Sequence, residues 1–191
     1  MPLLFTSRAD GDTGPHSRDA GWAIVHQVHG AGVVRATRPG FLGDGDAIVT
    51  TTPGLPIAVR VADCAPIALL ADGVVGVVHA GWRGIVAGVI PAALDAMRAL
   101  GARDVHAVLG PCIHAECYEF GPDELDAIAG RLGDRVRGTT SWGTPALDMP
   151  AAVRSQLPGV EDRSVCTACS PGHWSHRARG DRERQAVVVW M

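Results

Sequence analysis

The sequence of 191 residues contains no lysine, so all 17 of its basic residues are arginines. These arginines are scattered along the chain, except for a cluster between residues 177 and 184, and the formal net charge is −3. A nucleic-acid-binding domain normally gathers its positive charge on one face or stripe. The sequence therefore predicts no nucleic-acid partner.

Long apolar stretches and an export signal are also missing. The longest apolar runs, residues 73–78 and 186–190, are far shorter than the roughly 20 residues of a membrane-spanning helix. The opening residues, MPLLFTSRADGD, show no basic segment followed by a long apolar one. Five cysteines are an odd number for a disulfide framework, so we expect reduced thiols. Together these features predict a cytoplasmic protein with no membrane partner.

The apolar residues, 47% of the chain, are arranged in runs typical of buried strands. Continuous β-branched-rich runs at 55–62, 66–71 and 74–79 predict strands buried on both faces, with a tight turn at Asp72-Gly73. Further strands are predicted at 22–28, 33–37, 46–50, 105–109, 164–167 and 185–190. Loops or turns are predicted at 8–21, 40–45 and 137–145.

Helical spacing of apolar residues extends from Ile85 to Leu100 and ends before Gly101. Pro91 lies inside this stretch, so a kink or a restart is expected there. Shorter helices are predicted at 122–132 and 148–157, the latter with Asp148 as its N-cap. Because strands and helices alternate irregularly, the sequence predicts an α/β fold: one domain, 1–191, with mixed β-sheets and layered helices.

Three candidate metal ligands, His29, Cys64 and His79, stand at predicted strand ends beside Gly or Pro. A lone histidine is usually structural and a lone cysteine usually behaves as a small buried hydrophobe. Side chains at strand ends can nevertheless converge on one rim, and two imidazoles with a thiolate suit Zn²⁺ or copper with a fourth position open. Asp63, next to Cys64, is a candidate for proton handling or support of that ligand, and equally for capping a turn.

An anion site is predicted where the strand ending at His79 passes through a glycine-bracketed turn into a helix. The helix start offers free N–H groups around Gly81, and Arg83 places a positive charge in the first turn, against the helix dipole. The alternative is a surface arginine after a tight turn. Near the C-terminus, Trp-Ser-His-Arg at 174–177 carries groups able to bind phosphate or sugar hydroxyls, and alone reads as a polar loop.

The remaining cysteines carry weaker signals. Cys166 and Cys169 form a single C-x-x-C without a second pair, so buried or loop thiols are predicted, and Cys117 is expected to pack in the interior. Cys112 follows Gly110-Pro111 at a strand end and is a candidate to line the same pocket as the metal ligands.

Five motifs, taken in order, closely resemble those of the laccase-domain (multicopper polyphenol oxidoreductase-like) family: Gln-Val-His-Gly from Gln27, Ala-Asp-Cys-Ala-Pro from Ala62, His-Ala-Gly-Trp-Arg-Gly from His79, Gly-Pro-Cys-Ile from Gly110, and Ser-His-Arg from Ser175. The resemblance runs from about Phe5 to the C-terminus. It implies a Zn²⁺ site, with Cu²⁺ as the alternative, formed by His29, Cys64 and His79. Beside this metal site, we expect catalytic roles for Asp63 and Arg83, and substrate binding by Gln27, Gly81, Arg83, Cys112, His176 and Arg177.

Members of that family are described as purine nucleoside phosphorylases, and some as the peptidoglycan editing factor. The resemblance implies phosphorolysis of adenosine, inosine and methylthioadenosine, with adenosine deamination as a second activity. The sequence departs from the family in two places. The segment from Phe5 to Gln27 is short where the family has an additional N-terminal helix, and Ala178 replaces an arginine of the Ser-Tyr/His-Arg-Arg motif.

Three rival functions remain open. The first is a metal-free cysteine hydrolase that edits a peptidoglycan precursor, with Cys64 as nucleophile and His79 or His29 as base. The second is a copper-containing polyphenol oxidase, which the lack of any His-x-His motif among the 8 histidines disfavours. The third is a binding module without catalysis. The sequence carries no signal for the oligomeric state.

Overall fold

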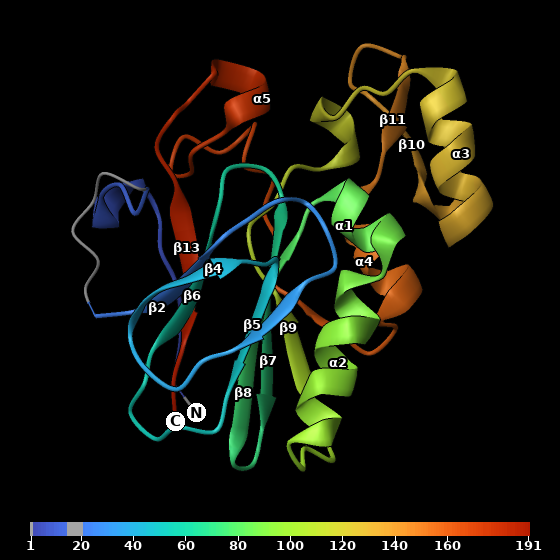
Figure 1. Ribbon diagram of the computed structural model, residues 1–191. Coiled ribbons are helices and arrows are strands. Elements are labelled where there is room, and N and C mark those ends of the chain that lie inside the picture. Colours follow the sequence, from blue (N-terminus) through green and yellow to red (C-terminus); the bar gives the residue numbers. More distant parts are fainter. Residues whose placement is uncertain (1, 15–20) are drawn as a thin grey trace.

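The computed structural model describes residues 2–14 and 21–191, and its strands pair into two large mixed sheets (Figure 1). The first sheet has the order β1 (Leu3–Phe5), β13 (Gln185–Val189), β6 (Ile57–Val61), β2 (Ala23–His26) and β4 (Gly40–Asp44). The second has the order β12 (Glu161–Asp162), β9 (His106–Leu109), β7 (Ala65–Ala71), β8 (Val74–Ala80), β5 (Ala47–Thr50) and β3 (Val33–Arg35). Parallel and antiparallel neighbours occur in both, which confirms the predicted α/β class with mixed sheets.

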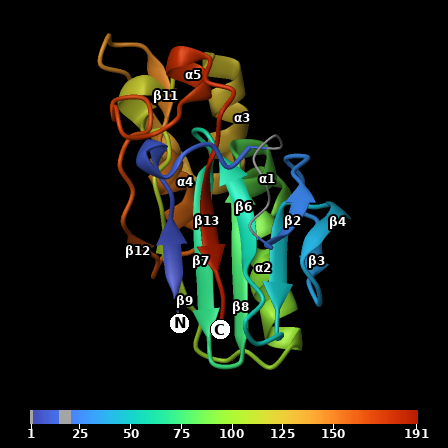
Figure 2. The same ribbon diagram turned by 90° about the vertical axis from the view of Figure 1, so that its left-hand side faces the viewer.

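The second sheet is the middle layer of the molecule, and both of its faces are buried. One face packs on the first sheet through apolar side chains that include Ile48, Val75, Val77 and Val187. The other packs on helices α1 (Trp82–Ala87), α2 (Val89–Ala99) and α4 (Met149–Gln156) through residues that include Ile67, Leu69, Ile90 and Met97. Figure 2 shows the first sheet in front of the second, with the helices behind. The continuous apolar character of β7 and β8 follows from this position, as predicted.

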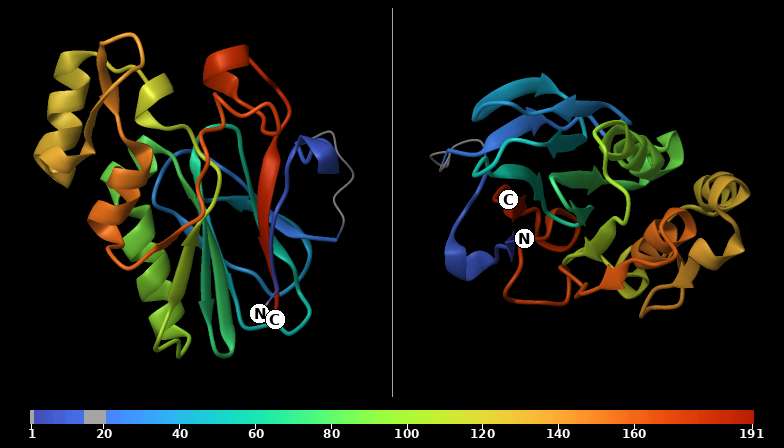
Figure 3. Two further views of the ribbon diagram at one scale, coloured as in Figure 1. Left: turned by 180° about the vertical axis from the view of Figure 1, so that it is seen from behind. Right: turned by 90° about the horizontal axis from the view of Figure 1, so that it is seen from below.

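A smaller unit stands on the outer side of the helical layer (Figure 3). Helix α3 (Pro122–Leu132) packs there beside a two-stranded hairpin of β10 (Arg137–Thr139) and β11 (Pro145–Leu147). Short 3-10 turns lie at Arg8–Asp10, Ala115–Cys117 and Asp134–Val136, and helix α5 (His176–Arg179) is a single turn before β13. No helix in the described part of the chain is long and apolar enough to cross a membrane.

Several predicted element boundaries are wrong, each for a local reason. The segment 137–145, predicted as a loop, belongs to the β10–β11 hairpin. The segment 40–45, predicted as a turn, contains strand β4 at the edge of the first sheet. An edge strand tolerates the positive φ angles of Gly40 and Gly43. The strand predicted at 164–167 is not formed, because the chain pairs earlier, at β12. The loop predicted at 8–21 begins with a 3-10 turn, and its residues 15–20 lie outside the described residues.

The long helix predicted around Pro91 is interrupted at Gly88 instead. Gly88 has φ 89° and serves as the C-cap of α1 and the N-cap of α2. Because glycine adopts the left-handed conformation without a steric penalty, it ends the first helix. Pro91 is then the third residue of α2, where its missing N–H has no partner to lose.

Candidate metal centre

The pairing of β7 with β8 brings two of the predicted ligands to the same end of the second sheet. Ala65 pairs with Ala80 and Pro66 with His79 in an antiparallel register. Cys64, which precedes β7, therefore lies beside the end of β8 and the start of α1. The third ligand, His29, reaches the same point from the loop after β2. We call His29, Cys64 and His79 the metal centre.

The three donor atoms of the metal centre lie within 4.8 Å of one another, and Cys64 Sγ is 3.8 Å from His29 Nε2. Tetrahedral zinc, with Zn–S near 2.3 Å and Zn–N near 2.0 Å, would separate sulfur and nitrogen by about 3.6 Å. The two imidazole rings stand edge to face, with centroids 4.8 Å apart. This donor set fits a zinc-type metal, and the distance between Cys64 Sγ and His29 Nε2 is already close to that in a tetrahedral site.

Asp46, at the start of β5, fixes the orientation of both histidines. Its carboxylate accepts hydrogen bonds from the His29 N–H at 2.9 Å, the Gly30 N–H at 2.7 Å and His79 Nδ1 at 2.8 Å, and it is fully buried. With Nδ1 held by Asp46, His79 presents Nε2 to the centre. Burial alone would raise the pKa of Asp46, but the hydrogen bonds from His79 and Gly30 outweigh it and hold that pKa below its usual range.

Without a metal, Cys64 and His79 form a thiolate–imidazolium pair. Burial favours the neutral thiol, yet the charge of His79 and the hydrogen bond from His29 prevail and lower the pKa of Cys64 to about 6. Burial also favours neutral His79, but the Cys64 thiolate and Asp46 raise its pKa to about 9. The pair therefore supplies a deprotonated sulfur near neutral pH, which is the form that binds a metal or attacks an electrophile.

The backbone around the metal centre is closely fitted. Among the described residues, the non-glycine residues with positive φ are His29, at 59°, and Asp63, at 92°. Such strain gathers at functional sites, where the surrounding structure enforces it. A Cβ on Gly81 would lie 2.8 Å from His29 Cδ2 and 3.2 Å from Cys64 Sγ. Glycine at this position is therefore required by the approach of two ligands.

Asp63 ties three separate segments together behind Cys64. Its Oδ1 accepts the Thr167 hydroxyl at 2.6 Å, its Oδ2 accepts the Arg177 N–H at 2.7 Å, and its carbonyl accepts the Ile113 N–H at 2.9 Å. The residue is 6% exposed. Because both carboxylate oxygens already hold partners, this geometry favours support of the Cys64 turn over proton transfer.

Two exposed arginines flank a row of aromatic rings formed by Trp82, Phe120 and Tyr118. The Arg83 guanidinium lies 4.5 Å from the Trp82 ring centroid, and that of Arg177 lies 4.9 Å from the Tyr118 centroid. The ring centroids of Trp82 and Phe120 are 5.9 Å apart, and those of Phe120 and Tyr118 are 4.8 Å apart, both edge to face. Burial, and next the Cys64 charge, raise the pKa of Tyr118, which places its hydroxyl in the electrostatic field of the metal centre.

The other predicted substrate-binding residues take different positions. The side-chain amide of Gln27 is engaged with the backbone of Arg60, donating at 2.7 Å and accepting at 2.9 Å, so it joins the His29 loop to β6. Cys112 is fully buried, its backbone pairs with that of Cys166 in an isolated parallel β-bridge, and the thiols of both residues are free. His176 is exposed on α5, at the end of the molecule opposite the chain termini (Figure 1).

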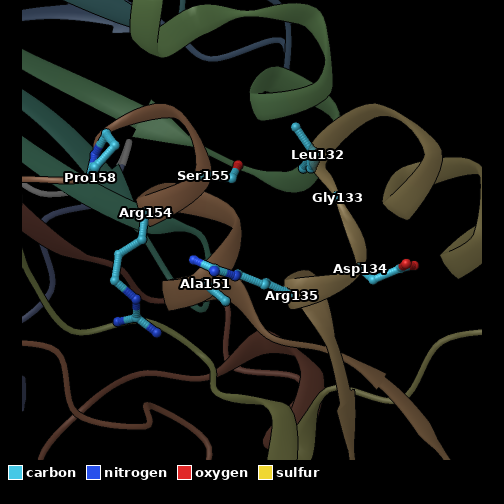
Figure 4. Close-up of a pocket in the computed structure, with 8 residues that line it drawn as sticks. All are labelled: Leu132, Gly133, Asp134, Arg135, Ala151, Arg154, Ser155 and Pro158. Atoms are coloured by element: carbon cyan, nitrogen blue, oxygen red, sulfur yellow. The ribbon is translucent and has the colours of Figure 1, made fainter.

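A cavity of about 500 Å³ lies elsewhere, between α3 and α4 (Figure 4). Its lining residues are Leu132, Gly133, Asp134, Arg135, Ala151, Arg154, Ser155 and Pro158. None of the residues predicted to form the functional site lines this cavity, as far as the described residues show. We assign the chemistry to the metal centre, because perturbed acid and thiol groups converge there and not in this cavity.

A comparison with family models decides the relationship of this chain to known proteins. Residues 10–191 match the model described as multi-copper polyphenol oxidoreductase laccase. The chain belongs to this laccase family. Two curated relatives of this laccase-family chain are named purine nucleoside phosphorylase. One, from Streptomyces coelicolor, is 44% identical over 87% of this chain and 74% of its own length. The other, from Mycobacterium bovis, is 41% identical over 87% and 71%.

Solved structures share the fold of this laccase-family chain. A Neisseria meningitidis protein superposes with a TM-score of 0.86 at 26% identity, over 99% of this chain and 93% of its own. The YlmD protein of Geobacillus stearothermophilus gives 0.77 at 30% identity, over 87% and 72%. The predicted family is therefore confirmed.

The sequence alone did not identify three residues near the metal centre of this laccase-family chain. Asp46 bonds to His79, Thr167 bonds to Asp63, and Tyr118 lies in the electrostatic field of Cys64. Asp46 resembles an ordinary turn residue in Gly-Asp-Gly-Asp, and only its position opposite two histidines distinguishes it. Thr167 lies 104 positions from Asp63 in the sequence, so no local pattern links them.

Proposed function

We propose that this chain is a metal-dependent purine nucleoside phosphorylase acting on adenosine, inosine and methylthioadenosine. One arrangement supports the proposal. The His/Cys/His centre lies next to a row of aromatic rings, with Arg83 over Trp82 at one end of the row and Arg177 over Tyr118 at the other. The names of the relatives from Streptomyces coelicolor and Mycobacterium bovis support the same activity.

The residues of the metal centre suit Zn²⁺ better than copper. Three protein ligands of mixed nitrogen and sulfur type leave a fourth position for substrate or water, which is the pattern of catalytic zinc. A bound Zn²⁺ would supply Lewis acidity toward an oxygen or nitrogen of the substrate. Asp46 would keep His29 and His79 aimed at the ion, and Asp63 would hold the turn that carries Cys64.

The two arginines and the aromatic row would bind the two substrates. Phosphate carries the charge that Arg83 and Arg177 complement, because an arginine guanidinium donates two parallel hydrogen bonds to phosphate oxygens. Helix α1 has 6 residues, too short to supply much dipole, so these side chains carry the attraction. The exposed part of Trp82 offers a flat surface for a purine.

Phosphorolysis breaks the C1′–N9 bond of the nucleoside and forms a bond from C1′ to a phosphate oxygen. The electron pair of the broken bond leaves with the purine, which takes up a proton. Positive charge develops on the ribose in the transition state, and a phosphate held by Arg83 and Arg177 faces that charge. We propose deamination of adenosine as a second activity of the same centre.

A cysteine hydrolase is the second candidate, because the lowered pKa of Cys64 gives a thiolate beside an imidazolium. In that reaction Cys64 would attack an amide carbonyl carbon, and the carbon–nitrogen bond would break as His79 protonates the leaving amine. Water would then hydrolyse the thioester, which releases the acid and restores the Cys64 thiol. Such an enzyme would work without metal, on a peptidoglycan precursor.

The experiment is a phosphate-dependent assay of base release from inosine, adenosine and methylthioadenosine, with metal content measured on the same samples. We expect activity that a chelator removes and Zn²⁺ restores, loss of more than about 100-fold in Cys64→Ala, and a raised KM for phosphate in Arg177→Ala. Arg103→Ala, an exposed arginine before β9, is the matched control and should retain activity. Base release that survives chelation, or none from metal-loaded protein, would contradict the proposal. Ammonia release from adenosine tests the deamination in the same samples.

A further inference from the structure

Three further cysteines meet on the far side of the Asp63 network. Cys117 ends the 3-10 turn Ala115–Cys117, and Cys166 and Cys169 flank the turn after β12. Their sulfur atoms all lie within 4.8 Å of one another, and Cys117 Sγ is 3.2 Å from Cys169 Sγ. We call these three residues the thiol cluster. The sequence predicted only packing or loop thiols here.

The backbone around Cys166 is directed toward its sulfur. The N–H of His114 donates to Cys166 Sγ at 3.4 Å, and the backbone amides of Cys169 and Ala168 also favour a thiolate there. Burial outweighs these amides and raises the pKa of the Cys166 thiol above its usual value. A bound cation would offset this effect of burial, because it stabilises the thiolate that ligates it.

A fourth donor stands next to the thiol cluster. Glu116 Oε1 lies 3.9 Å from Cys169 Sγ and 3.7 Å from His114 Nδ1, and His114 Nε2 is bonded to Ser164 at 3.0 Å. The Glu116 carboxylate therefore lies between the His114 ring and the sulfur of Cys169. Cys166 is buried, Cys117 is half-buried and Cys169 is exposed, so an ion can enter from solvent.

We propose that Cys117, Cys166 and Cys169 bind a second, thiophilic metal ion, Zn²⁺, with Glu116 in the fourth position. The C-x-x-C spacing and soft donors match structural zinc sites. Zn–S bonds of about 2.3 Å would set the sulfurs about 3.8 Å apart, so Cys117 and Cys169 need to separate by about 0.6 Å. Binding would release the protons of the thiols.

The bound ion would join the 114–117 segment to the turn that positions Asp63. Thr167, inside the C-x-x-C, donates to the Asp63 carboxylate at 2.6 Å, and Arg179 donates to the carbonyls of Thr167 and Ala168 at 3.1 and 2.9 Å. The role is structural: the ion would hold the wall behind Cys64. It does not depend on which reaction the metal centre performs.

The test separates the thiol cluster from the metal centre with a His29→Ala/Cys64→Ala double variant, purified under reducing conditions. We expect about one Co²⁺ or Zn²⁺ per chain, strong sulfur-to-cobalt charge-transfer absorption in the ultraviolet, and a higher melting temperature with Zn²⁺. Adding Cys169→Ser should remove the uptake, whereas adding Cys112→Ala, a cysteine outside both groups, should leave it unchanged.

A second measurement needs no variant of the thiol cluster. Alkylation of the wild-type chain, mapped by mass spectrometry, should show Cys117, Cys166 and Cys169 protected together by Zn²⁺, and released together by a chelator. Unprotected thiols with no cobalt absorption in the double variant would overturn the proposal. So would a Cys117–Cys169 disulfide that persists in reductant, because it would remove two ligands.

Discussion

At the scale of single residues, the metal centre depends on one carboxylate that is not among the three candidate ligands. Asp46 accepts from the backbone of His29 and Gly30 and from the side chain of His79. One buried group therefore positions both the loop that carries His29 and the imidazole ring of His79. Removing this carboxylate should therefore lower the affinity of the centre for a metal.

We predict that Asp46→Asn weakens Zn²⁺ binding by about 10- to 100-fold, the usual effect of losing a partner that orients a ligating histidine. The Asp46 carboxylate also accepts the Val28 N–H at 3.3 Å, and an asparagine amide would present an N–H₂ group to some of these four donors, so at least one of the four hydrogen bonds is lost. Competition with a chromophoric chelator measures the affinity. Asp44→Asn, at an exposed carboxylate paired with His26, is the control and should bind as the wild type does. Equal affinities for the two variants would contradict this role.

The charge pair at the metal centre predicts the pH dependence of the metal-free chain. The raised pKa of His79 contributes stability that is lost as pH rises from 6.5 through about 9. The lowered pKa of Cys64 contributes stability that is lost as pH falls from 9.0 through about 6. The two slopes nearly cancel, because folding moves a proton from sulfur to imidazole without changing the number bound.

The reactivity of the Cys64 thiol depends on pH even though the stability does not, because only the thiolate reacts. We predict that alkylation of Cys64 in metal-free protein rises to a plateau with a midpoint near pH 6. His79→Gln should move this midpoint toward the ordinary thiol value, because the largest favourable charge is gone. The rate of iodoacetamide modification, followed by mass spectrometry, measures this midpoint, and His106→Gln, at an exposed histidine that begins β9, is the control. A midpoint unchanged by His79→Gln would show that the pair does not form.

Much of the metal centre was predictable from sequence, because its ligands sit in short motifs with recognisable glycines. His29, Cys64 and His79 meet as predicted. The partners that support them were not predictable, because they come from distant segments. Asp46 reaches His79 across the β5–β8 pair, and the thiol cluster needs Cys117 next to a C-x-x-C far along the chain.

At the scale of elements, the junction between β8 and α1 carries the tightest constraint. Gly81 has φ −69° and ψ 156°, a backbone conformation open to any residue. What excludes a side chain is the presence of His29 and Cys64 against its α-carbon. The need for glycine is therefore one of space, not of backbone conformation.

We predict that Gly81→Ala displaces His29 and Cys64 and weakens metal binding at least about tenfold, since such overpacking typically costs about 1–3 kcal/mol. Gly121→Ala is a close control: Gly121 is also a helix N-cap, with φ −63° and ψ 144°, and a Cβ there meets nothing within 4 Å. Isothermal titration with Zn²⁺ and a melting curve on each variant make the comparison. Normal zinc binding by Gly81→Ala would contradict the packing argument.

Elements with a strong apolar pattern were predicted well, and elements set by edge pairing were not. Strands β6, β7 and β8 follow from continuous apolar runs because both faces are buried. Strands β4 and β10 contain glycine and polar residues, and they exist because a neighbouring backbone pairs with them. A run of apolar residues indicates that a strand is buried. Strands β4 and β10 are only half-buried or exposed, so they lack such a run and were not predicted.

At the scale of the whole molecule, the first sheet is assembled from both ends of the chain. Strand β13 lies between β1 and β6, and Leu3 pairs with Val189. The buried side chains of Val187 and Val189 also contribute to the layer between the two sheets. The last strand is therefore a central element of the fold.

We predict that a chain ending at Arg184 loses cooperative unfolding, because β1 and β6 lose the partner they share and the layer between the sheets is opened. A chain ending at Val189 keeps every β13 pair and should unfold in a single transition. Thermal circular dichroism and binding of a hydrophobic dye distinguish the two. A sharp transition in the shorter chain would show that the first sheet is stable without β13.

The position of β13 also orders events during synthesis. Strands β5, β7, β8 and β9 of the second sheet, with α1 and α2, come from the continuous stretch 47–109, so they can assemble while the ribosome is still translating. Strand β6 leaves the ribosome after β5 but before β7, β8 and β9, and the edge that pairs with β13 stays unpaired until β13 emerges more than 120 residues later. Until then the unpaired edge of β6 is open to pairing with other chains, so we expect the partly made chain to aggregate more readily than the finished fold.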